Sequence, residues 1–194
     1  MGNSITSWFG PLLTREKAGF LMFGLDDAGK SSIAFKLQLG EVVQSTPTEG
    51  FTVETLEYRN VKITVWDVGG DMKIRPFFRH FYKDFTHLIL VVDSSDRERI
   101  RESKIELNKM LEEEELQGLP LLVFASKNDL QNVLKSEEIV KELDLNSIRN
   151  RSWYIQSCSS STGNGLYEGL EWISNSKYTP QRFNTAKSAR SVVN

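Results

Sequence analysis

The sequence feature that most constrains the fold is the glycine-rich segment GLDDAGKS at residues 24–31, which fits the pattern G-x-x-x-x-G-K-[ST]. An apolar run, AGFLMFG at residues 18–24, precedes it and predicts a buried strand, and a helical pattern follows over residues 30–39. Glycines let backbone N–H groups turn toward a phosphate, and the start of a helix adds the positive end of its dipole. The segment therefore predicts a phosphate-binding loop between a strand and a helix.

Two side chains of this loop have distinct expected roles. The Lys30 ammonium group is suited to the β- and γ-phosphates of a nucleotide, and the Ser31 hydroxyl is suited to Mg²⁺. A phosphate loop alone does not distinguish a kinase from an ATPase or a GTPase. The other candidate nucleotide-binding residues of the segment are Gly24, Leu25, Asp26, Asp27, Ala28, Gly29 and Ser32.

The rest of the chain alternates strand-like and helical patterns. Strands are predicted at residues 51–58, 61–66, 88–93, 121–126 and 153–157, and helices at residues 97–115, 136–143 and 166–175. Only two residues separate the first two of these strands, so they are expected to form a hairpin. The continuous apolar runs LILVVD and LLVFAS are typical of parallel strands covered on both faces. The pattern predicts a three-layer α/β fold with a mostly parallel sheet and helices on both faces.

Three further segments indicate which nucleotide binds. Asp67 follows a strand, where a carboxylate can hold Mg²⁺ through water, and the backbone N–H of Gly70 can approach a γ-phosphate. Thr48 can supply Mg²⁺ with a second hydroxyl. The segment SKND at residues 126–129 ends a strand, and there Asp129 can accept hydrogen bonds from the guanine N1–H and exocyclic amine. Adenine has no such pair of donors, so these segments favour a guanine nucleotide.

Length and composition limit the remaining possibilities. The chain has 194 residues, which is one domain by ordinary domain sizes. Its 24 basic and 26 acidic residues nearly balance, so it is not expected to bind nucleic acid. The single cysteine, Cys158, excludes an internal disulfide and is expected to be a small buried residue. No apolar run approaches the about 18 residues of a membrane-spanning helix.

The two ends differ from the domain expected at residues 18–176. The start MGNSIT fits the N-myristoylation pattern, so Gly2 is the expected acylation site of an apolar N-terminal segment at residues 1–17. One acyl chain anchors a protein weakly, and the apolar stripe can supply the second signal. Its members are Ile5, Trp8, Phe9, Leu12 and Leu13. Residues 177–194 are basic and are expected to form a flexible tail, with weak contact to anionic lipid as the alternative.

The sequence from Gly24 to Trp172 resembles the small GTPases of the ADP-ribosylation factor family. The runs that carry the resemblance are GLDDAGKSS, PTEGFTVETLEYRN, TVWDVGGDMKIRPFFRH, LILVVDSSDRER, LLVFASKNDL and GLYEGLEW. The resemblance implies a six-stranded sheet and a GDP/GTP switch with two mobile loops, one around Thr48 and one at residues 67–82. It also implies a hairpin that slides in register, guanine contacts from Ser159 and Ser160, and an aromatic effector surface formed by Phe51, Trp66 and Phe81.

The resemblance also implies a biological setting. It implies a monomeric, Mg²⁺-dependent switch in vesicle-mediated protein transport, cytoplasmic and reversibly bound to Golgi or other internal membranes. Expected partners are a guanine-nucleotide exchange factor, a GTPase-activating protein that supplies an arginine, and coat or other effector proteins. The residues implied to act in hydrolysis are Lys30, Thr48, Gly70 and the residue at position 71.

Four positions depart from the family pattern. Asp71 stands where the family has a glutamine that orients the attacking water, and an aspartate is shorter and negatively charged. Asp27 and Glu49 replace a small neutral and an apolar residue, and Ser126 replaces an asparagine that braces the base-binding loop. Negative charge near the phosphates favours GDP over GTP unless Asp27 and Glu49 point into water. We expect slow hydrolysis and a nucleotide affinity below the family norm.

Two alternatives remain beside the switch. Because of Asp71, the chain can be a nucleotide-binding scaffold of the same fold with little or no hydrolysis. A nucleotide kinase is the other alternative, but the sequence has no arginine-rich lid segment and a kinase leaves the SKND segment unexplained.

Overall fold

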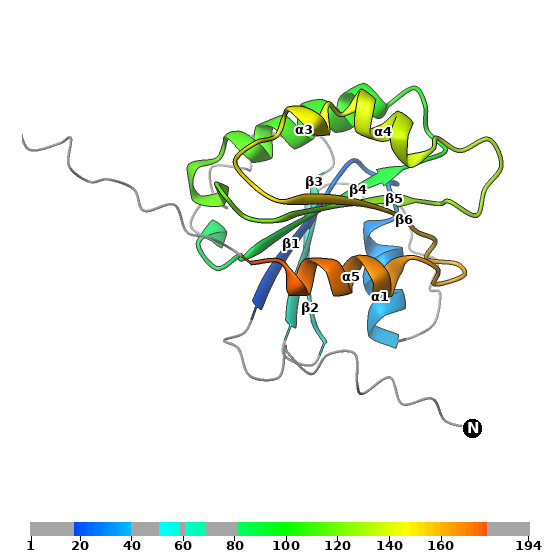
Figure 1. Ribbon diagram of the computed structural model, residues 1–194. Helices are drawn as coiled ribbons and strands as arrows, with labels where there is room; N and C mark the ends of the chain where they lie inside the picture. The colour runs from blue at the N-terminus through cyan, green and yellow to red at the C-terminus, as the bar shows by residue number, and fades with distance from the viewer. Residues whose placement is uncertain (1–17, 40–50, 59–60, 69–80, 178–194) are drawn as a thin grey trace, which may run out of the picture.

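A computed structural model of the chain describes residues 18–39, 51–58, 61–68 and 81–177 (Figure 1). The expected myristoylated segment at residues 1–17 and the tail beyond residue 177 lie outside these ranges. No helix within the described ranges is long and apolar enough to cross a membrane.

Six strands of the described residues form one sheet in the order β2-β3-β1-β4-β5-β6. Their bounds are β1 Ala18–Phe23, β2 Phe51–Tyr58, β3 Val61–Val68, β4 His87–Asp93, β5 Leu121–Ser126 and β6 Trp153–Ser157. Five strands, β3, β1, β4, β5 and β6, are parallel to one another, and β2 is antiparallel to β3. The predicted hairpin is confirmed, since Tyr58 pairs with Val61 across a two-residue connection.

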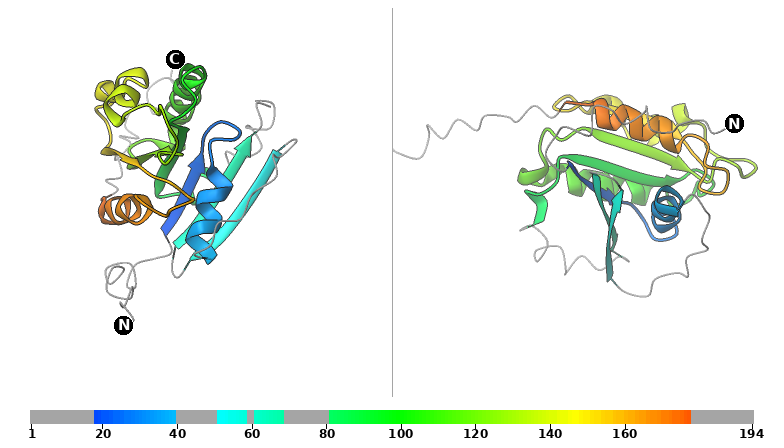
Figure 2. Two further views of the ribbon diagram at one scale, coloured as in Figure 1. Left: turned by 90° about the vertical axis from the view of Figure 1, so that its right-hand side faces the viewer. Right: turned by 90° about the horizontal axis from the view of Figure 1, so that it is seen from below.

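Helices cover both faces of this sheet. α1 (Lys30–Leu39) and α5 (Leu166–Asn175) lie on one face, and α3 (Ile100–Glu112) and α4 (Ser136–Glu142) lie on the other (Figure 1). The left view of Figure 2 shows the same arrangement, with α3 and α4 above the strands and α5 below them. Short 3-10 helices at Glu114–Leu116 and Leu145–Ser147 lie on the face of the sheet that α3 and α4 cover. The predicted three-layer α/β fold is confirmed.

The side-chain alternation along the central strands divides the apolar core between the two faces. On β1, Leu21 packs into the cluster beneath α3 and α4, whereas Met22 packs into the cluster beneath α1 and α5. Both residues are fully buried. Strands β4 and β5 follow the same rule, which explains why their sequences are apolar without interruption.

One predicted helix is shorter than expected. The pattern favoured a helix over residues 97–115, but α3 begins at Ile100 and ends at Glu112. At its start, the Asp96 carboxylate accepts a hydrogen bond from the Arg99 backbone N–H at 3.0 Å, which holds the preceding residues in a turn. At its end, Glu113 adopts an extended conformation (φ −66°, ψ 124°). Glutamate has a high helix propensity, but the acidic run at residues 112–115 lies at the C-terminal end of the helix, where negative charge is unfavourable.

Candidate nucleotide-binding site

The parallel strands bring the predicted site segments to one edge of the sheet. β1, β4 and β5 end at Phe23, Asp93 and Ser126, and their register is continuous, since Asp93 pairs with Ser126. The loops that follow the carboxyl ends of parallel strands meet at this edge. The phosphate loop at residues 24–31 and the base loop at residues 126–129 are therefore neighbours, although about a hundred residues separate them in sequence.

Glycine is required at two positions of the phosphate loop. Gly24 has φ +145°, and a Cβ there would lie 2.3 Å from the Val91 carbonyl oxygen. Gly29 has φ +95°, a conformation that other residues adopt with strain. The loop consequently lies directly against β4 and turns sharply into α1, whose ladder starts with Ile33 N–H donating to the Gly29 carbonyl at 3.0 Å.

The Lys30 side chain is folded into the loop that precedes it. Lys30 is 2% exposed, and its ammonium group donates to the carbonyl oxygens of Gly24 at 3.0 Å and Leu25 at 2.6 Å. Ser31 and Ser32 follow in the first turn of α1 and are half-buried. The loop thus gathers a positive charge and a hydroxyl at the start of a helix, which is the arrangement that phosphate and Mg²⁺ binding require.

Ser126 connects the base loop to the phosphate loop. Its side chain is buried, and its Oγ lies 2.6 Å from the Ala28 carbonyl oxygen and 3.1 Å from that of Val92. A hydroxyl donates one hydrogen bond, and the shorter distance favours Ala28 as its acceptor. Ser94 fixes the strand end behind it, because its hydroxyl donates to the Ser126 carbonyl at 2.5 Å. The serine therefore reaches the phosphate loop, although it is shorter than asparagine.

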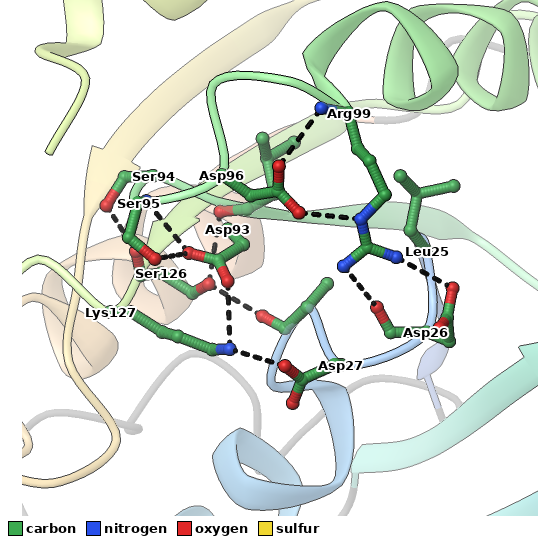
Figure 3. Close-up of polar contacts among 12 residues, drawn as sticks. Leu25, Asp26, Asp27, Asp93, Ser94, Ser95, Asp96, Arg99, Ser126 and Lys127 are labelled. Atoms are coloured by element: carbon green, nitrogen blue, oxygen red, sulfur yellow. Dashed lines mark hydrogen bonds and ion pairs between the residues drawn. The ribbon is translucent and has the colours of Figure 1, made fainter. Parts of the chain in front are cut away.

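Lys127 lies between two carboxylates. Its ammonium group is 2.8 Å from Asp93 Oδ2 and 3.1 Å from Asp27 Oδ2 (Figure 3). Burial disfavours the ammonium ion, but the bonds to Asp93 and Asp27 outweigh this effect and raise the pKa of Lys127. The Asp27 side chain is 76% exposed, so it does face water, but it also pairs with a cation.

Asp26 forms its ion pair on the other side of the phosphate loop, with Arg99. The Arg99 guanidinium donates from Nη1 to Asp26 Oδ1 at 3.0 Å and from Nε to Asp96 Oδ2 at 2.6 Å (Figure 3). Hydrogen bonds from Arg99 hold the pKa of Asp96 below its ordinary value, and the same pairing raises the pKa of Arg99. The phosphate loop is thus held by Arg99 on one side and by Ser126 and Lys127 on the other.

The base loop is also bonded to Cys158, the residue that precedes the serine loop at residues 159–161. The Asn128 N–H donates to the Cys158 carbonyl at 3.1 Å, and the Cys158 N–H donates to the Ala125 carbonyl at 2.8 Å. Burial and the charge of Asp129 raise the pKa of the Cys158 thiol to about 12. Asp129 is itself exposed, and Ser159 is buried next to the half-buried Ser160. The two segments expected to contact guanine therefore lie together, and Cys158 is buried as predicted.

Several predicted residues lie outside the described part of the chain. These are Gly2, Thr48, Glu49, Gly70 and Asp71. Phe51, Trp66 and Asp67 are placed only by their backbone, in the β2–β3 hairpin, where Phe51 pairs with Val68 and Asp67 with Thr52. Phe81 is 53% exposed. Within the described ranges, no group of three or more His, Cys, Asp or Glu side chains can hold a metal ion.

Sequence reasoning missed the residues that support the phosphate loop from β4 and α3. Asp93, Asp96 and Arg99 belong to a run that carried the family resemblance, but no role was predicted for them. One signal was available for Asp93, since it ends an apolar strand expected beside the strand of the phosphate loop. The ion pair between Asp26 and Arg99 joins residues 73 positions apart and has no local signature.

The comparison with protein families agrees with this geometry. The model of the ADP-ribosylation factor family matches residues 5–177, which include every described element of the structure.

Proposed function

The chain belongs to the ADP-ribosylation factor family of small GTP-binding GTPases, and from this premise we propose that it is a GDP/GTP switch in vesicle-mediated protein transport. We propose that its intrinsic hydrolysis is slow and depends on a partner. The observation that carries the proposal is the contact between the two loops, in which the Ser126 hydroxyl reaches the Ala28 carbonyl at 2.6 Å. This contact joins a phosphate-binding loop to a segment suited to guanine.

Each loop supplies a different part of nucleotide recognition. Lys30 and the N–H groups at the start of α1 bind the phosphates, and Asp129 accepts hydrogen bonds from the guanine edge. The backbone N–H groups of Ser159 and Ser160 complete the base site. Two of these segments are bonded to each other through Asn128 and Cys158, which supports a preformed base site.

The residues expected to bind Mg²⁺ supply oxygen donors only. Ser31 lies in the first turn of α1, which fits a hydroxyl ligand beside the phosphates. Thr48 and Asp67 are the other proposed ligands, Asp67 through water. Magnesium, when bound, neutralises charge on the phosphates. A site of this kind needs few carboxylates, because the nucleotide itself supplies oxygens.

Position 71 decides how fast the switch turns itself off. A glutamine there can orient a water molecule toward the γ-phosphate, whereas Asp71 is shorter and is repelled by the same phosphate. We propose that a GTPase-activating protein supplies an arginine, and that Gly70 contributes its N–H to the γ-phosphate. An exchange factor then restores GTP.

The proposed place of action is the cytoplasmic surface of Golgi or other internal membranes. The myristoylation pattern at Gly2 and the apolar stripe that follows it support reversible anchoring. The half-exposed Phe81 supports an aromatic effector surface, which Phe51 and Trp66 are proposed to share. Coat or other effector proteins are the expected ligands of this surface.

Single-turnover hydrolysis tests the proposal at its most unusual residue. The protein is loaded with GTP and Mg²⁺, and phosphate release is compared between the unaltered chain and Asp71→Gln. We expect slow release that the substitution accelerates at least about tenfold, because glutamine restores the orienting group. Asp144→Asn is the control, since Asp144 lies beyond α4 and is predicted to leave the rate unchanged.

Two other results have clear meanings. Phosphate release no faster than a blank without protein would favour the alternative, a nucleotide-binding scaffold without turnover. Equal rates for the unaltered chain and Asp71→Gln would contradict the role given to position 71.

A further inference from the structure

Asp27 is one of the four positions that depart from the family pattern, and among the described residues it is the one of them that forms an ion pair. Its Oδ2 lies 3.1 Å from the Lys127 ammonium group, and this contact spans 100 positions of sequence. A neutral small residue at position 27, as the family pattern has, makes no such contact. The ion pair is therefore a link between the phosphate loop and the base loop that the family pattern does not predict.

Both partners of this ion pair have an unusual backbone. Asp27 has φ +56° and Lys127 has φ +54°, the left-handed conformation that costs free energy for most residues other than glycine. Aspartate tolerates this conformation better than lysine does. The loop therefore accepts an aspartate at position 27, while Lys127 needs support from its surroundings to hold its conformation.

The two carboxylates that support Lys127 differ in how firmly they are held. Asp93 is nearly buried, and its other oxygen accepts hydrogen bonds from the Ser95 N–H at 2.8 Å and hydroxyl at 2.6 Å. Asp27 is exposed and belongs to the phosphate loop itself. Asp93 thus fixes the ammonium group to the sheet, and Asp27 attaches the phosphate loop to that fixed point (Figure 3).

The pairing also changes the electrostatic effect expected of Asp27. A lone carboxylate in the phosphate loop repels the phosphates and weakens nucleotide binding. A carboxylate paired with an ammonium group at 3.1 Å has a much shorter-ranged field, because the two charges offset each other. Whether Asp27 weakens or strengthens nucleotide binding then depends on where it holds Lys127, which precedes Asp129 by two residues in the base loop.

We infer that Asp27 is a positioning residue for guanine nucleotide binding: by pairing with Lys127 it ties the phosphate loop to the base loop and slows nucleotide release. This inference rests on the proposed function. It gives Asp27 the opposite effect from that of an unpaired negative charge, so the direction of the change on substitution distinguishes the two.

The test measures how fast a fluorescent GDP leaves the full-length protein in Mg²⁺ buffer at low and high salt. Asp27→Asn removes the charge and keeps a residue that tolerates the left-handed conformation. We expect release to become about two- to fivefold faster at low salt, the range for a partly exposed ion pair. At high salt the difference should shrink, because salt screens the pair in the unaltered protein.

Asp144→Asn is the matched control. Asp144 also has a left-handed backbone (φ +56°) and an exposed side chain, and its carboxylate lies 3.9 Å from the Lys104 ammonium group. It lies before the 3-10 helix Leu145–Ser147, outside both loops. The substitution is expected to leave nucleotide release unchanged at either salt concentration.

A double substitution separates positioning through Lys127 from any other role. If Asp27 acts through Lys127, Asp27→Asn has no further effect on release in a Lys127→Ala background. Additive effects, or release that is unchanged or slower in Asp27→Asn alone, would overturn the inference while leaving guanine binding intact. Failure of the unaltered protein to bind guanine nucleotide would instead overturn the proposed function, and the inference with it.

Discussion

Asp26 and Asp27 are adjacent in the phosphate loop, but they form ion pairs with residues on opposite sides of the loop. Asp26 pairs with Arg99, which also holds Asp96 at the start of α3. Asp27 pairs with Lys127 in the base loop, beside the buried contact between Ser126 and Ala28. We call these the α3 side and the base side of the phosphate loop.

The two sides differ in burial and in what lies behind them. The base side contains a buried hydroxyl that bonds to the loop backbone, and it continues into the residues expected to recognise guanine. The α3 side consists of partly exposed ion pairs, with side-chain exposures of 31% for Arg99 and 66% for Asp26. Buried hydrogen bonds are costly to break, whereas exposed ion pairs contribute little. Substitutions on the base side should therefore affect nucleotide binding more.

The largest effect is expected at Asp129, the end of the base side. Asp129→Ala removes the acceptor for both guanine donors, and we expect GDP affinity to fall about a hundredfold. Binding of GDP and of inosine diphosphate, which lacks the exocyclic amine, is measured by fluorescence competition. The unaltered protein should prefer GDP, and the variant should lose most of this preference. A preference that survives Asp129→Ala would place base recognition elsewhere.

An intermediate effect is expected at Ser126. Ser126→Ala leaves the buried Ala28 carbonyl without its hydrogen bond, so we expect a loss of about 1–2 kcal/mol in the free energy of unfolding and about tenfold faster GDP release. Urea unfolding and stopped-flow release measure the two quantities. Ser103→Ala, at a buried serine of α3, is the control that should leave release unchanged.

Ser126→Asn sharpens the same test. The family pattern has asparagine at this position, which predicts tighter nucleotide binding. Because the serine already reaches Ala28, we expect a gain smaller than the loss in Ser126→Ala. A gain of tenfold or more would show that the serine contact does not replace what an asparagine supplies at this position.

The smallest effect on binding is expected at Arg99 on the α3 side. Arg99→Ala should change GDP release by less than about twofold and lower the free energy of unfolding by less than about 1 kcal/mol. Release as fast as in Ser126→Ala would remove the distinction between the two sides.

The pH dependence of this stability loss identifies its source. Arg99 lowers the pKa of Asp96 from its ordinary value of 3.8, so the pair stabilises the folded state above that pH. The contribution disappears as pH falls through the lowered pKa. In urea unfolding, the difference between Arg99→Ala and the unaltered protein should be constant above about pH 5 and shrink toward pH 3. A difference independent of pH would point to lost packing instead.

The sequence predicted most of the fold because its strands are marked locally. The uninterrupted apolar runs at β4 and β5, and the two-residue connection between β2 and β3, are properties of neighbouring residues. The helix expected over residues 97–115 was too long, because the high helix propensity of glutamate was counted at every position. The acidic run at residues 112–115 lies at the C-terminal end of α3, where negative charge is unfavourable for the helix dipole, and Glu113 is extended.

The candidate site likewise has one part that a local sequence pattern predicts and another part that no local pattern predicts. The phosphate loop was found because its chemistry needs a fixed spacing of glycines, lysine and serine. The supports of that loop were not found, since Arg99 and Lys127 meet their aspartates only after the sheet has formed. The sequence left Asp27 either as a charge that repels the phosphates or as a side chain that points into water, and the ion pair was not predicted because a partner 100 positions away leaves no local pattern. The roles of Thr48, Gly70 and Asp71 stay predictions from sequence.

The most direct test of the account is the identity of the nucleotide that the protein carries when it is purified in Mg²⁺ buffer. The protein is denatured, and the released nucleotide is identified and quantified by chromatography. We predict close to one GDP per chain, because the joined loops select guanine and retain it through purification. GTP in its place would support the scaffold without turnover, and an ATP-loaded or empty protein would contradict guanine selection by the base side.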